Sequence, residues 1–571
     1  MGYAGVSSRL AAAGICIVGL LLAETSAVRA ASRPNVVIIL ADDMGFSDLG
    51  CYGGEIHTPH IDAMAQQGVR FAQFYNMARC CPTRASLLTG LYPHQAGIGA
   101  MNQKLDNKPA YQGELNDKCV TLAEVLRSSG YHTAMVGKWH LCHLNIAHVP
   151  EAQAKAMLDY QVDDPISESK ANWPCNRGFE EHWGTIPGVE NYYDPYGLVH
   201  NEVTIRPDKP NFYYTDFITD HAVQMVDNYA ADPRPFFMYV AYTAPHWPLQ
   251  AREKDIEHYA ETYSVGWDAI RQARFARQIA MGLVDKEWGL SPRAWNPALN
   301  EGESIVGPWK SAPAKAWQAR RMAVYAAMIE NMDRGVGKIL DEISARGIDR
   351  NTMVIFLSDN GACQEQVESG WYDVASKTRD GTDIVVGNKS SYMPGPEEVY
   401  QSYGPAWANA SNTPFRKFKH FTEEGGIATP FIVRWPGTVN QTGQIEKDQV
   451  GDVIDLMPTI LDVAGASYPK RFKNNVIVPE EGIDLLPIIV GGPANSRGPL
   501  CWEHEGNRAV RIDNWKLVAP HGEAWKLFDM VNDRTELHDV AAEHPDKVKQ
   551  LHEAYDAWVK RCGVEEWPIN D

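Results

Sequence analysis

A run of consecutive apolar residues, Asn35-Val-Val-Ile-Ile-Leu40, constrains the fold of this chain more than any other feature. The run is rich in β-branched residues and shows no polar alternation, which is typical of a strand buried on both faces of a parallel sheet. It ends in Ala41-Asp42-Asp43-Met44-Gly45. Open α/β sheets bind their ligands at the carboxyl ends of such strands, so Asp42 and Asp43 are candidate functional residues.

Similar apolar runs recur along the chain, and they predict further strands at residues 133–136, 235–242, 352–357 and 430–434. Between the strands lie helical patterns, the clearest of which places apolar residues at helical spacing from Met322 to Ile343. This alternation predicts an α/β fold in which helices cover a sheet. Polar residues follow three of the strands, in Gly137-Lys-Trp-His140, Pro245-His-Trp247 and Ser358-Asp-Asn-Gly361. Functional side chains are therefore expected to gather at one edge of the sheet.

The C-terminal part of the chain has a different pattern, with short predicted strands at 509–512, 515–518 and 525–528 and a helix near 545–560. This pattern predicts a small antiparallel sheet with a C-terminal helix. We therefore divide the chain into a large domain, residues 31–465, and a C-terminal subdomain, residues 466–571. Segments 141–215 and 250–318 are rich in Trp, Tyr, Pro, Asn and charge, and we interpret them as insertions that build walls around a site.

Residues 1–30 are predicted to be a signal peptide. Arg9 precedes an apolar run from Leu10 to Leu22, and Val28-Arg29-Ala30 places small residues two apart, as at a signal-peptidase site. The apolar run is short for a membrane span, and no later segment is long and apolar enough for one. The mature protein is therefore expected to be exported, periplasmic or secreted, with no membrane attachment after signal cleavage.

The chain is acidic, with a formal net charge of −19 at pH 7. Such a charge does not attract nucleic acid or anionic lipid by its overall field, so no nucleic-acid partner is expected. If the substrate is an anion, a local cationic site must bind it. Nine cysteines remain once Cys16 is removed with the signal peptide. An odd number implies that at least one thiol has a fate other than disulfide pairing.

The most informative motif is the stretch from Cys80 to Gly90, Cys-Cys-Pro-Thr-Arg-Ala-Ser-Leu-Leu-Thr-Gly. Its Cys-x-Pro-Thr-Arg pattern, followed by Leu-Leu-Thr-Gly as a helix start, resembles the signature of the formylglycine-dependent sulfatases. In that family the first Cys is oxidised to Cα-formylglycine, an aldehyde side chain. The resemblance places this modification on Cys80 and leaves Cys81 unmodified. Removal of Cys80 from the nine thiols leaves an even number.

Two acidic pairs match the metal-binding positions of the same family. Asp42 and Asp43 match its N-terminal pair, and Asp359 and Asn360 match its second pair. The resemblance also places the modified Cys80 beside the metal. Carboxylate and amide oxygens suit a hard cation, which indicates Ca²⁺, with Mg²⁺ as the second choice.

Cationic and imidazole groups match the remaining site positions of the family. Lys138 and His140 lie two residues apart, so in an extended segment both would point to one face. His246 matches a further catalytic His of the family. Lys419 lies five residues before Glu424-Gly-Gly426, at the spacing of the family's second Lys, with Lys417 as a competitor. The resemblance implies that Arg84 holds the formylglycine loop.

The resemblance covers nearly all of the mature chain and is closest to the bacterial arylsulfatases. It implies an alkaline-phosphatase-like fold, with a large α/β domain whose central mixed sheet is flanked by helices. A smaller C-terminal domain with a short antiparallel sheet and a helix would follow. The implied partners are a small-molecule sulfate ester and, during maturation, a formylglycine-generating enzyme.

The implied activity is hydrolysis of sulfate monoesters, with aryl sulfates as the favoured class. In the implied mechanism, the hydrated aldehyde at residue 80 would attack sulfur with help from Asp359 as base, and a covalent sulfo-enzyme would result. His246 or Lys419 protonates the leaving oxygen. His140 then deprotonates the remaining hydroxyl, and the collapse to the aldehyde releases inorganic sulfate.

Two alternatives remain open at this point. The first is a phosphonate or phosphate ester hydrolase on the same scaffold, and the second is a non-catalytic relative that retains an anion site. Tyr193 and Trp247 could stack on an aromatic leaving group, line a sugar subsite or pack internally. The natural substrate, the oligomeric state and the disulfide pairing are not determined by the sequence.

Overall fold

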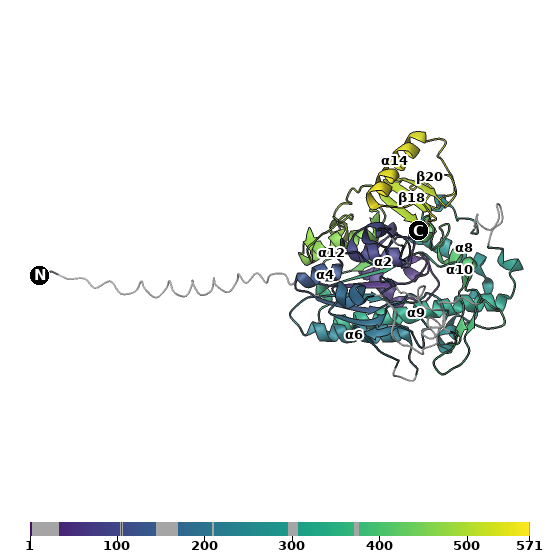
Figure 1. The fold of residues 1–571 in the computed structure, drawn as a ribbon, viewed down its shortest axis with the longest axis horizontal. Helices are drawn as coiled ribbons and strands as arrows, with labels where there is room; N and C mark the ends of the chain where they lie inside the picture. Colours follow the sequence, from purple (N-terminus) through teal and green to yellow (C-terminus); the bar gives the residue numbers. More distant parts are fainter. Residues whose placement is uncertain are drawn as a thin grey trace.

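The structure is a computed structural model that describes residues 1–2, 33–102, 104–105, 107–143, 169–207, 211–294, 306–369 and 376–569 (Figure 1). The features that predict a signal peptide therefore lie outside the described residues. Across the described part of the chain, none of the helices combines the length and the apolar character that crossing a bilayer requires.

In the part of the chain that the structure describes, the core is a mixed sheet of ten strands. From one edge to the other, the strands are β13 (Gln444–Glu446), β2 (Val69–Phe71), β12 (Phe431–Arg434), β9 (Thr352–Ser358), β1 (Asn35–Ala41), β8 (Phe236–Ala241), β4 (His132–Gly137), β5 (Glu181–Thr185), β6 (Leu198–His200) and β7 (Val203–Thr204). Two-stranded sheets join β10 (Val385–Val386) to β11 (Val399–Tyr400), β14 (Gly451–Asp452) to β3 (Phe74–Tyr75), and β15 (Arg471–Phe472) to β16 (Asn475–Val476).

Four parallel strands form the centre of this sheet, in the order β9, β1, β8 and β4. Leu40 of β1 pairs with Ala241 of β8 and with Leu357 of β9, so the three strands end at the same level. All residues of these four strands are buried, which explains their continuous apolar sequences. Since parallel strands end at one edge, the residues that follow them are brought together there.

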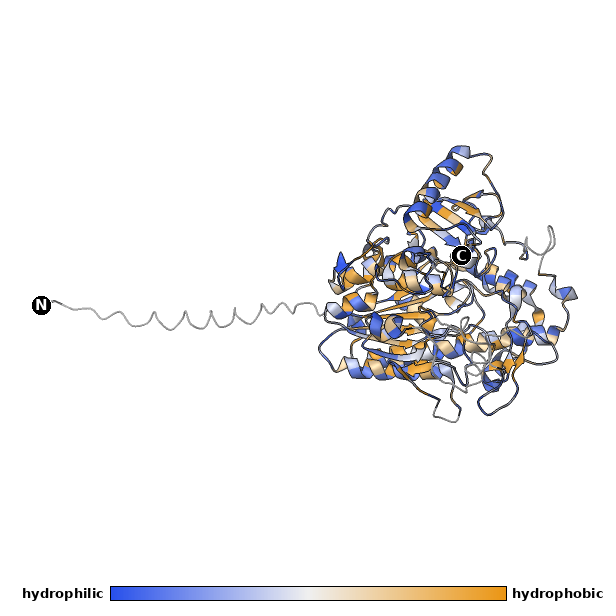
Figure 2. Ribbon diagram, in the orientation of Figure 1, coloured by the Kyte–Doolittle hydropathy of each residue, from blue (hydrophilic) through white to orange (hydrophobic). Residues whose placement is uncertain are grey.

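Helices cover both faces of the sheet. In Figure 1, α2 (Cys80–Thr89), α4 (Leu122–Ser128) and α12 (Leu456–Ala464) lie on one side, and α6 (Tyr214–Ala230) and α9 (Lys315–Ala345) lie on the other. The contacts agree with this view, because α12 contacts α2 and α4, whereas α9 contacts α6 and α1 (Pro59–Gln67). Apart from α14, the other α-helices of the described residues are α3 (Pro93–Ala96), α7 (Glu253–Ile256), α8 (Trp267–Met281), α10 (Gly404–Ser411), α11 (Glu424–Ile427) and α13 (Leu486–Ile489). Figure 2 shows hydrophobic residues concentrated on the central strands.

A second, four-stranded antiparallel sheet lies near the C-terminus. It joins β17 (Leu500–His504), β18 (Asn507–Ile512), β19 (Trp515–Ala519) and β20 (Lys526–Asp529) in chain order. Helix α14 (Pro545–Cys562) packs on β18 and β19. It buries Leu551, Tyr555, Trp558 and Cys562, which recur at helical spacing.

The predicted fold class is confirmed: the protein has a large α/β part with a mixed sheet and a smaller C-terminal part with an antiparallel sheet and a helix. Strand 430–434 is present as β12, which runs antiparallel to β9. The thiols of the nine described cysteines are free, and none of these residues forms a disulfide with another.

A buried histidine beside the central strands predicts a pH dependence of stability. His182 of β5 is fully buried, and its Nε2 lies 3.3 Å from the carbonyl oxygen of Gly137. Burial lowers the pKa of His182 to about 4. The unfolded chain therefore binds a proton below pH 6.5 that the folded chain binds only near pH 4, so the protein loses stability as the pH falls through this window.

We expect His182→Gln, which cannot be protonated, to reduce the loss of unfolding free energy between pH 7 and pH 4 by about 3 kcal/mol. Urea denaturation at the two pH values measures this difference. His538→Gln is the matched control, because the His538 side chain is 77% exposed. An identical acid-induced loss in the wild-type protein and the His182 variant would contradict the assignment.

Candidate active site

Four strand ends deliver the predicted polar residues to one place. Asp42 and Asp43 follow β1, Lys138 and His140 follow β4, His246 follows β8, and Asp359 and Asn360 follow β9. All of these side chains belong to residues that are at most 7% exposed. The site is thus a product of the parallel topology at the centre of the sheet.

The two acidic pairs lie in direct contact. The Nδ2 atom of Asn360 donates a hydrogen bond of 2.7 Å to Oδ1 of Asp43, and the backbone N–H of Asp43 donates to Oδ1 of Asp359 at 3.2 Å. Two buried oxygens of this group, Oδ1 of Asp42 and Oδ1 of Asn360, have no hydrogen-bond partner. Orphaned buried acceptors are costly in a folded protein, so these oxygens are available to a cation.

Three buried cations surround the acidic residues. Nζ of Lys138 lies 2.5 Å from Oδ2 of Asp42, and Nζ of Lys419 lies 2.9 Å from Oδ2 of Asp43. Arg84 was expected to hold the loop that carries residue 80; this segment is the start of helix α2, and Arg84 belongs to the same helix. Its Nη2 lies 2.8 Å from Oδ2 of Asp359, and its Nη1 donates to the carbonyl oxygen of Lys138. Arg84 therefore also connects α2 to the acidic group.

The charges in this cluster shift the pKa values of its carboxyl groups in opposite directions. Burial tends to raise the pKa of Asp42, but the charges of Lys138, His246 and Arg84 outweigh burial and lower it. Burial and the negative charge of Asp42 raise the pKa of Asp359 well above its usual range. Two neighbouring carboxylates repel each other when both are ionised, and a further positive charge between them would relieve this repulsion.

Cys80 occupies the first position of helix α2, with Arg79 as the N-cap. The helix ends at Thr89, and Gly90 caps it with a φ of 68° in the left-handed region. The prediction that Leu87-Leu-Thr-Gly90 starts a helix is therefore wrong, because this stretch ends the helix that Cys80 begins. The N-terminal position places the side chain of residue 80 at the positive end of the helix dipole.

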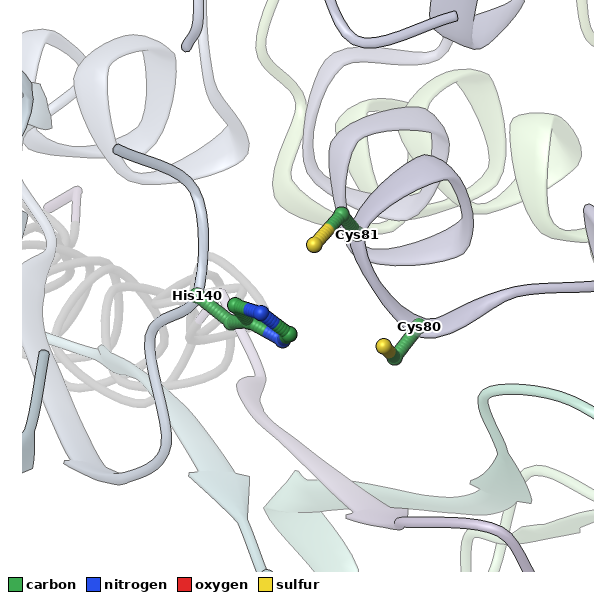
Figure 3. A group of neighbouring side chains, drawn as sticks. All are labelled: Cys80, Cys81 and His140. Atoms are coloured by element: carbon green, nitrogen blue, oxygen red, sulfur yellow. The ribbon is translucent and has the colours of Figure 1, made fainter. Parts of the chain in front are cut away.

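Cys80, Cys81 and His140 form a compact group, with the His140 ring turned toward the two thiols (Figure 3). One ligand atom from each residue lies within 4.8 Å of the others. A hydrogen bond from Cys81 lowers the pKa of the Cys80 thiol, whereas burial tends to raise it. Together with the nearby Lys138 and His140, this hydrogen bond holds the pKa well below its usual range. Burial raises the pKa of Cys81. Burial also lowers the pKa of His140 to about 4, so its ring is neutral at pH 7 and can accept a proton.

The prediction of an extended segment at Lys138 and His140 needs a correction. Strand β4 ends at Gly137, and His140 has a φ of 59° in the left-handed region. Lys138 consequently reaches Asp42, whereas His140 faces Cys80. Both side chains still reach the site, but from an irregular segment that follows the strand.

The remaining predicted residues also reach this place. His246 Nε2 lies 3.3 Å from Oδ2 of Asp43 and 3.4 Å from Nζ of Lys419. Of the two lysine candidates, Lys419 is at the site, whereas the Nζ of Lys417 lies over the ring of Phe421 at 4.6 Å. The spacing to Glu424 therefore selected the lysine that contacts Asp43.

The insertion that spans residues 141–215 contributes to the support of the site. The hydroxyl of Tyr192 donates to the carbonyl oxygens of Thr243 and His246, which fixes the turn that carries His246. Tyr193 packs against the ring of Tyr213 at 5.4 Å. Trp247 is 6% exposed, and its indole N–H donates to Glu365. Trp247 is therefore packed internally, whereas Tyr193 is half-buried.

Sequence reasoning missed two charged residues at the rim of the site, Arg79 and Glu365. Their side chains form an ion pair of 3.0 Å, and each is 18% exposed. Arg79 directly precedes Cys80, and Glu365 lies six residues after Asp359. Their proximity along the sequence to site residues is the only signal that could have indicated them.

Comparison with known proteins gives results that agree with the family resemblance of the motifs. The family model described as Sulfatase matches residues 34–466. An arylsulfatase from Klebsiella aerogenes is 33% identical, over 82% of this chain and 95% of its own. An uncharacterized sulfatase from Schizosaccharomyces pombe is 32% identical, over 93% of this chain and 94% of its own. A solved structure in complex with D-glucosamine-2-N,6-O-disulfate shares the fold, with a TM-score of 0.59, 20% identity and coverage of 93% and 98%.

Proposed function

This chain belongs to the sulfatase family and is a sulfuric ester hydrolase. On this basis, we propose that it cleaves sulfate monoesters through a formylglycine side chain at residue 80. Aryl sulfates are the proposed substrate class. The products are the phenol or alcohol and inorganic sulfate. The relative from Klebsiella aerogenes carries the name arylsulfatase, which supports the aryl preference.

The observation that carries this proposal is the convergence of residue 80 with fixed cations and acidic residues at one sheet edge. A sulfate ester carries negative charge on its oxygens, so a catalyst must neutralise these oxygens, hold a nucleophile against sulfur and protonate the leaving oxygen. Lys138 and Lys419 supply buried positive charge. An acidic protein can thereby bind an anionic substrate.

The donor set fits a divalent metal ion. Asp42, Asp43, Asp359 and Asn360 offer oxygen ligands, and the orphaned Oδ1 atoms of Asp42 and Asn360 have no other partner. The side chain of residue 80 would complete the set. Oxygen donors of this kind suit Ca²⁺, with Mg²⁺ as the second choice. When bound, such an ion would polarise a sulfate oxygen and orient the nucleophile.

Conversion of Cys80 to formylglycine would supply a hydrated aldehyde with two hydroxyl groups. One hydroxyl would attack sulfur, and the second would allow the sulfate to leave. The roles of the other residues are proposed from their positions. His140 is neutral and faces residue 80, so it can accept the proton of the second hydroxyl. Lys419 and His246, which lie 3.4 Å apart, are the candidates that protonate the leaving oxygen. Asp359 is the candidate base for the first step, and Arg84 holds it in place.

We further propose the organisation that the sequence predicted. Residues 1–30 would act as a signal peptide for export to the periplasm or the outside of the cell. Residues 31–465 would form the catalytic domain and residues 466–571 the C-terminal subdomain. A formylglycine-generating enzyme would act on Cys80 during maturation.

Removal of the metal tests the proposal together with its main alternative. Treatment with a chelator is expected to lower the rate of p-nitrophenyl sulfate hydrolysis by about 100-fold or more, and Ca²⁺ is expected to restore it better than Mg²⁺. The restored enzyme is then assayed with p-nitrophenyl phosphate and a phosphonate ester. A higher kcat/KM for a phosphorus ester would favour the alternative hydrolase. Normal hydrolysis by protein that elemental analysis finds free of metal would refute the metal assignment.

A further inference from the structure

Glu365 is a single carboxylate that contacts three segments of the site at once. Its Oε1 atom lies 3.0 Å from Nη2 of Arg79. Its Oε2 atom accepts a hydrogen bond of 2.8 Å from the indole N–H of Trp247 and lies 3.9 Å from Nζ of Lys419. Neither the motif analysis nor the proposed reaction gives this residue a role.

Two partners of Glu365 are sequence neighbours of candidate catalytic residues, and the third partner is itself a candidate catalytic residue. Arg79 is the N-cap of α2 and directly precedes Cys80. Trp247 directly follows His246, and Lys419 is itself a candidate proton donor. Glu365 itself lies in the segment after β9 that begins with Asp359 and Asn360. One side chain thus joins four segments that are far apart in the sequence.

From these contacts we propose that Glu365 is a positioning residue for departure of the leaving group. It sets the direction of the Lys419 ammonium group and fixes the loop that carries His246. This inference rests on the proposed sulfatase reaction, and it adds a residue to that reaction. Glu365 is not a catalytic residue, because it acts through its protein partners.

The charges around Lys419 explain how a second anion would orient its ammonium group. Nζ of Lys419 lies 2.9 Å from Oδ2 of Asp43, 3.4 Å from Nε2 of His246 and 3.9 Å from Oε2 of Glu365. A lysine side chain has several rotatable bonds, so one anionic partner leaves its ammonium group free to turn. Two anionic partners restrict the ammonium group to one direction.

Direct binding of substrate by Glu365 is disfavoured by charge. A carboxylate at the rim of a site for sulfate esters would repel the substrate, unless a cation neutralises it. Arg79 supplies that cation, and both oxygens of Glu365 already face protein donors. Burial raises the pKa of Glu365, but Lys419, Arg79 and His246 outweigh it and hold this pKa well below its usual range. Glu365 is therefore ionised and engaged with the protein.

The test compares two aryl sulfates that differ in their need for a proton. Nitrophenolate leaves readily without one, whereas the phenolate of phenyl sulfate is a poorer leaving group. Glu365→Gln keeps the size of the side chain but removes its charge. We expect kcat/KM for p-nitrophenyl sulfate to fall by about 3-fold or less, and kcat/KM for phenyl sulfate to fall by about 30-fold or more.

The ratio of the two kcat/KM values is the decisive readout, because general damage to the fold would lower both values together. Glu368→Gln is the matched control: the same change three residues further on, at an exposed position, should leave the ratio unchanged. Glu365→Asp keeps the charge on a shorter side chain and should shift the ratio in the same direction as Glu365→Gln. It also serves if the Gln variant does not fold.

An unchanged ratio in both Glu365 variants would overturn the inference, even if kcat/KM falls equally for the two substrates. A wild-type protein that hydrolyses neither aryl sulfate would instead contradict the proposed function. The two failures are therefore distinguishable.

Discussion

Cys80→Ser is expected to lower kcat for aryl sulfates by about 10³-fold or more and to leave a sulfated protein behind. A serine hydroxyl can take up the sulfo group with the help of the same cations and acidic residues. It lacks the second hydroxyl on the same carbon, whose deprotonation would release the sulfate. Release then requires attack by water at sulfur, which is slow because the ester is anionic.

Mass spectrometry of the peptide that carries residue 80 checks this prediction. The wild-type peptide should have a mass about 18 Da below that of the unmodified Cys peptide. After incubation with substrate, the Cys80→Ser peptide should carry the added mass of one SO₃ group. Cys81→Ser is the matched control, and its kcat should stay within about 10-fold of the wild type, because no step is assigned to this thiol.

Full turnover by Cys80→Ser would refute the proposed mechanism. A fully active wild-type protein with an unmodified thiol at residue 80 would refute it as well. A protein whose thiol is unmodified and which binds sulfate esters without hydrolysing them would favour the non-catalytic alternative.

The central strands were predictable because burial on both faces leaves a plain signature in the sequence. Strand β1 and its neighbours β8 and β9 read as unbroken apolar runs. The outer strands β5, β2 and β13 were missed. They are short and contain exposed or half-buried residues, so their sequences do not differ from those of loops. Their strand character comes from pairing with a neighbour.

The site residues were predictable where a motif is local, and unpredictable where a contact is long-range. Asp42 and Asp359 each follow a strand, and the parallel order of β1 and β9 brings them together. The ion pair of Arg79 with Glu365 joins residues that no periodicity relates. The conformation of His140 was also hidden, because a left-handed φ at a non-Gly residue is set by its surroundings and not by its own preference.

The second large effect expected concerns stability and the contact between the C-terminal sheet and helix α11. Lys516 of β19 is fully buried, and its Nζ lies 3.0 Å from Oε1 of Glu424 and 2.8 Å from Oε1 of Glu536. Glu424 is the first residue of α11 and also accepts from Nε of Arg534 at 2.8 Å. Burial tends to raise the pKa of Glu424, but Lys516 and Arg534 outweigh it and lower this pKa. Removal of Lys516 takes away one of the two cations beside Glu424 and the cation beside Glu536, so buried negative charge is left uncompensated.

We therefore expect Lys516→Met to lower the free energy of unfolding by about 3–5 kcal/mol, which urea denaturation followed by tryptophan fluorescence measures. Lys526→Met is the matched control in the next strand. Its Nζ lies 2.9 Å from Oε2 of Glu523, but its side chain is 35% exposed, so the loss should stay below about 1 kcal/mol.

A further variant separates the loss of charge balance from the loss of packing. Burial beside Glu424 raises the pKa of Glu536 to about 7, so Glu536 is the carboxyl group that is most easily neutralised. Loss of Lys516 raises the pKa of Glu536 further, so Lys516→Met and its combination with Glu536→Gln are compared at about pH 9, where Gln removes the charge of Glu536 while the cavity around Met stays the same. If unpaired charge causes the loss, the double variant should recover at least about 1 kcal/mol of it. A Lys516→Met protein as stable as the Lys526→Met control would show that this buried cluster does not stabilise the fold.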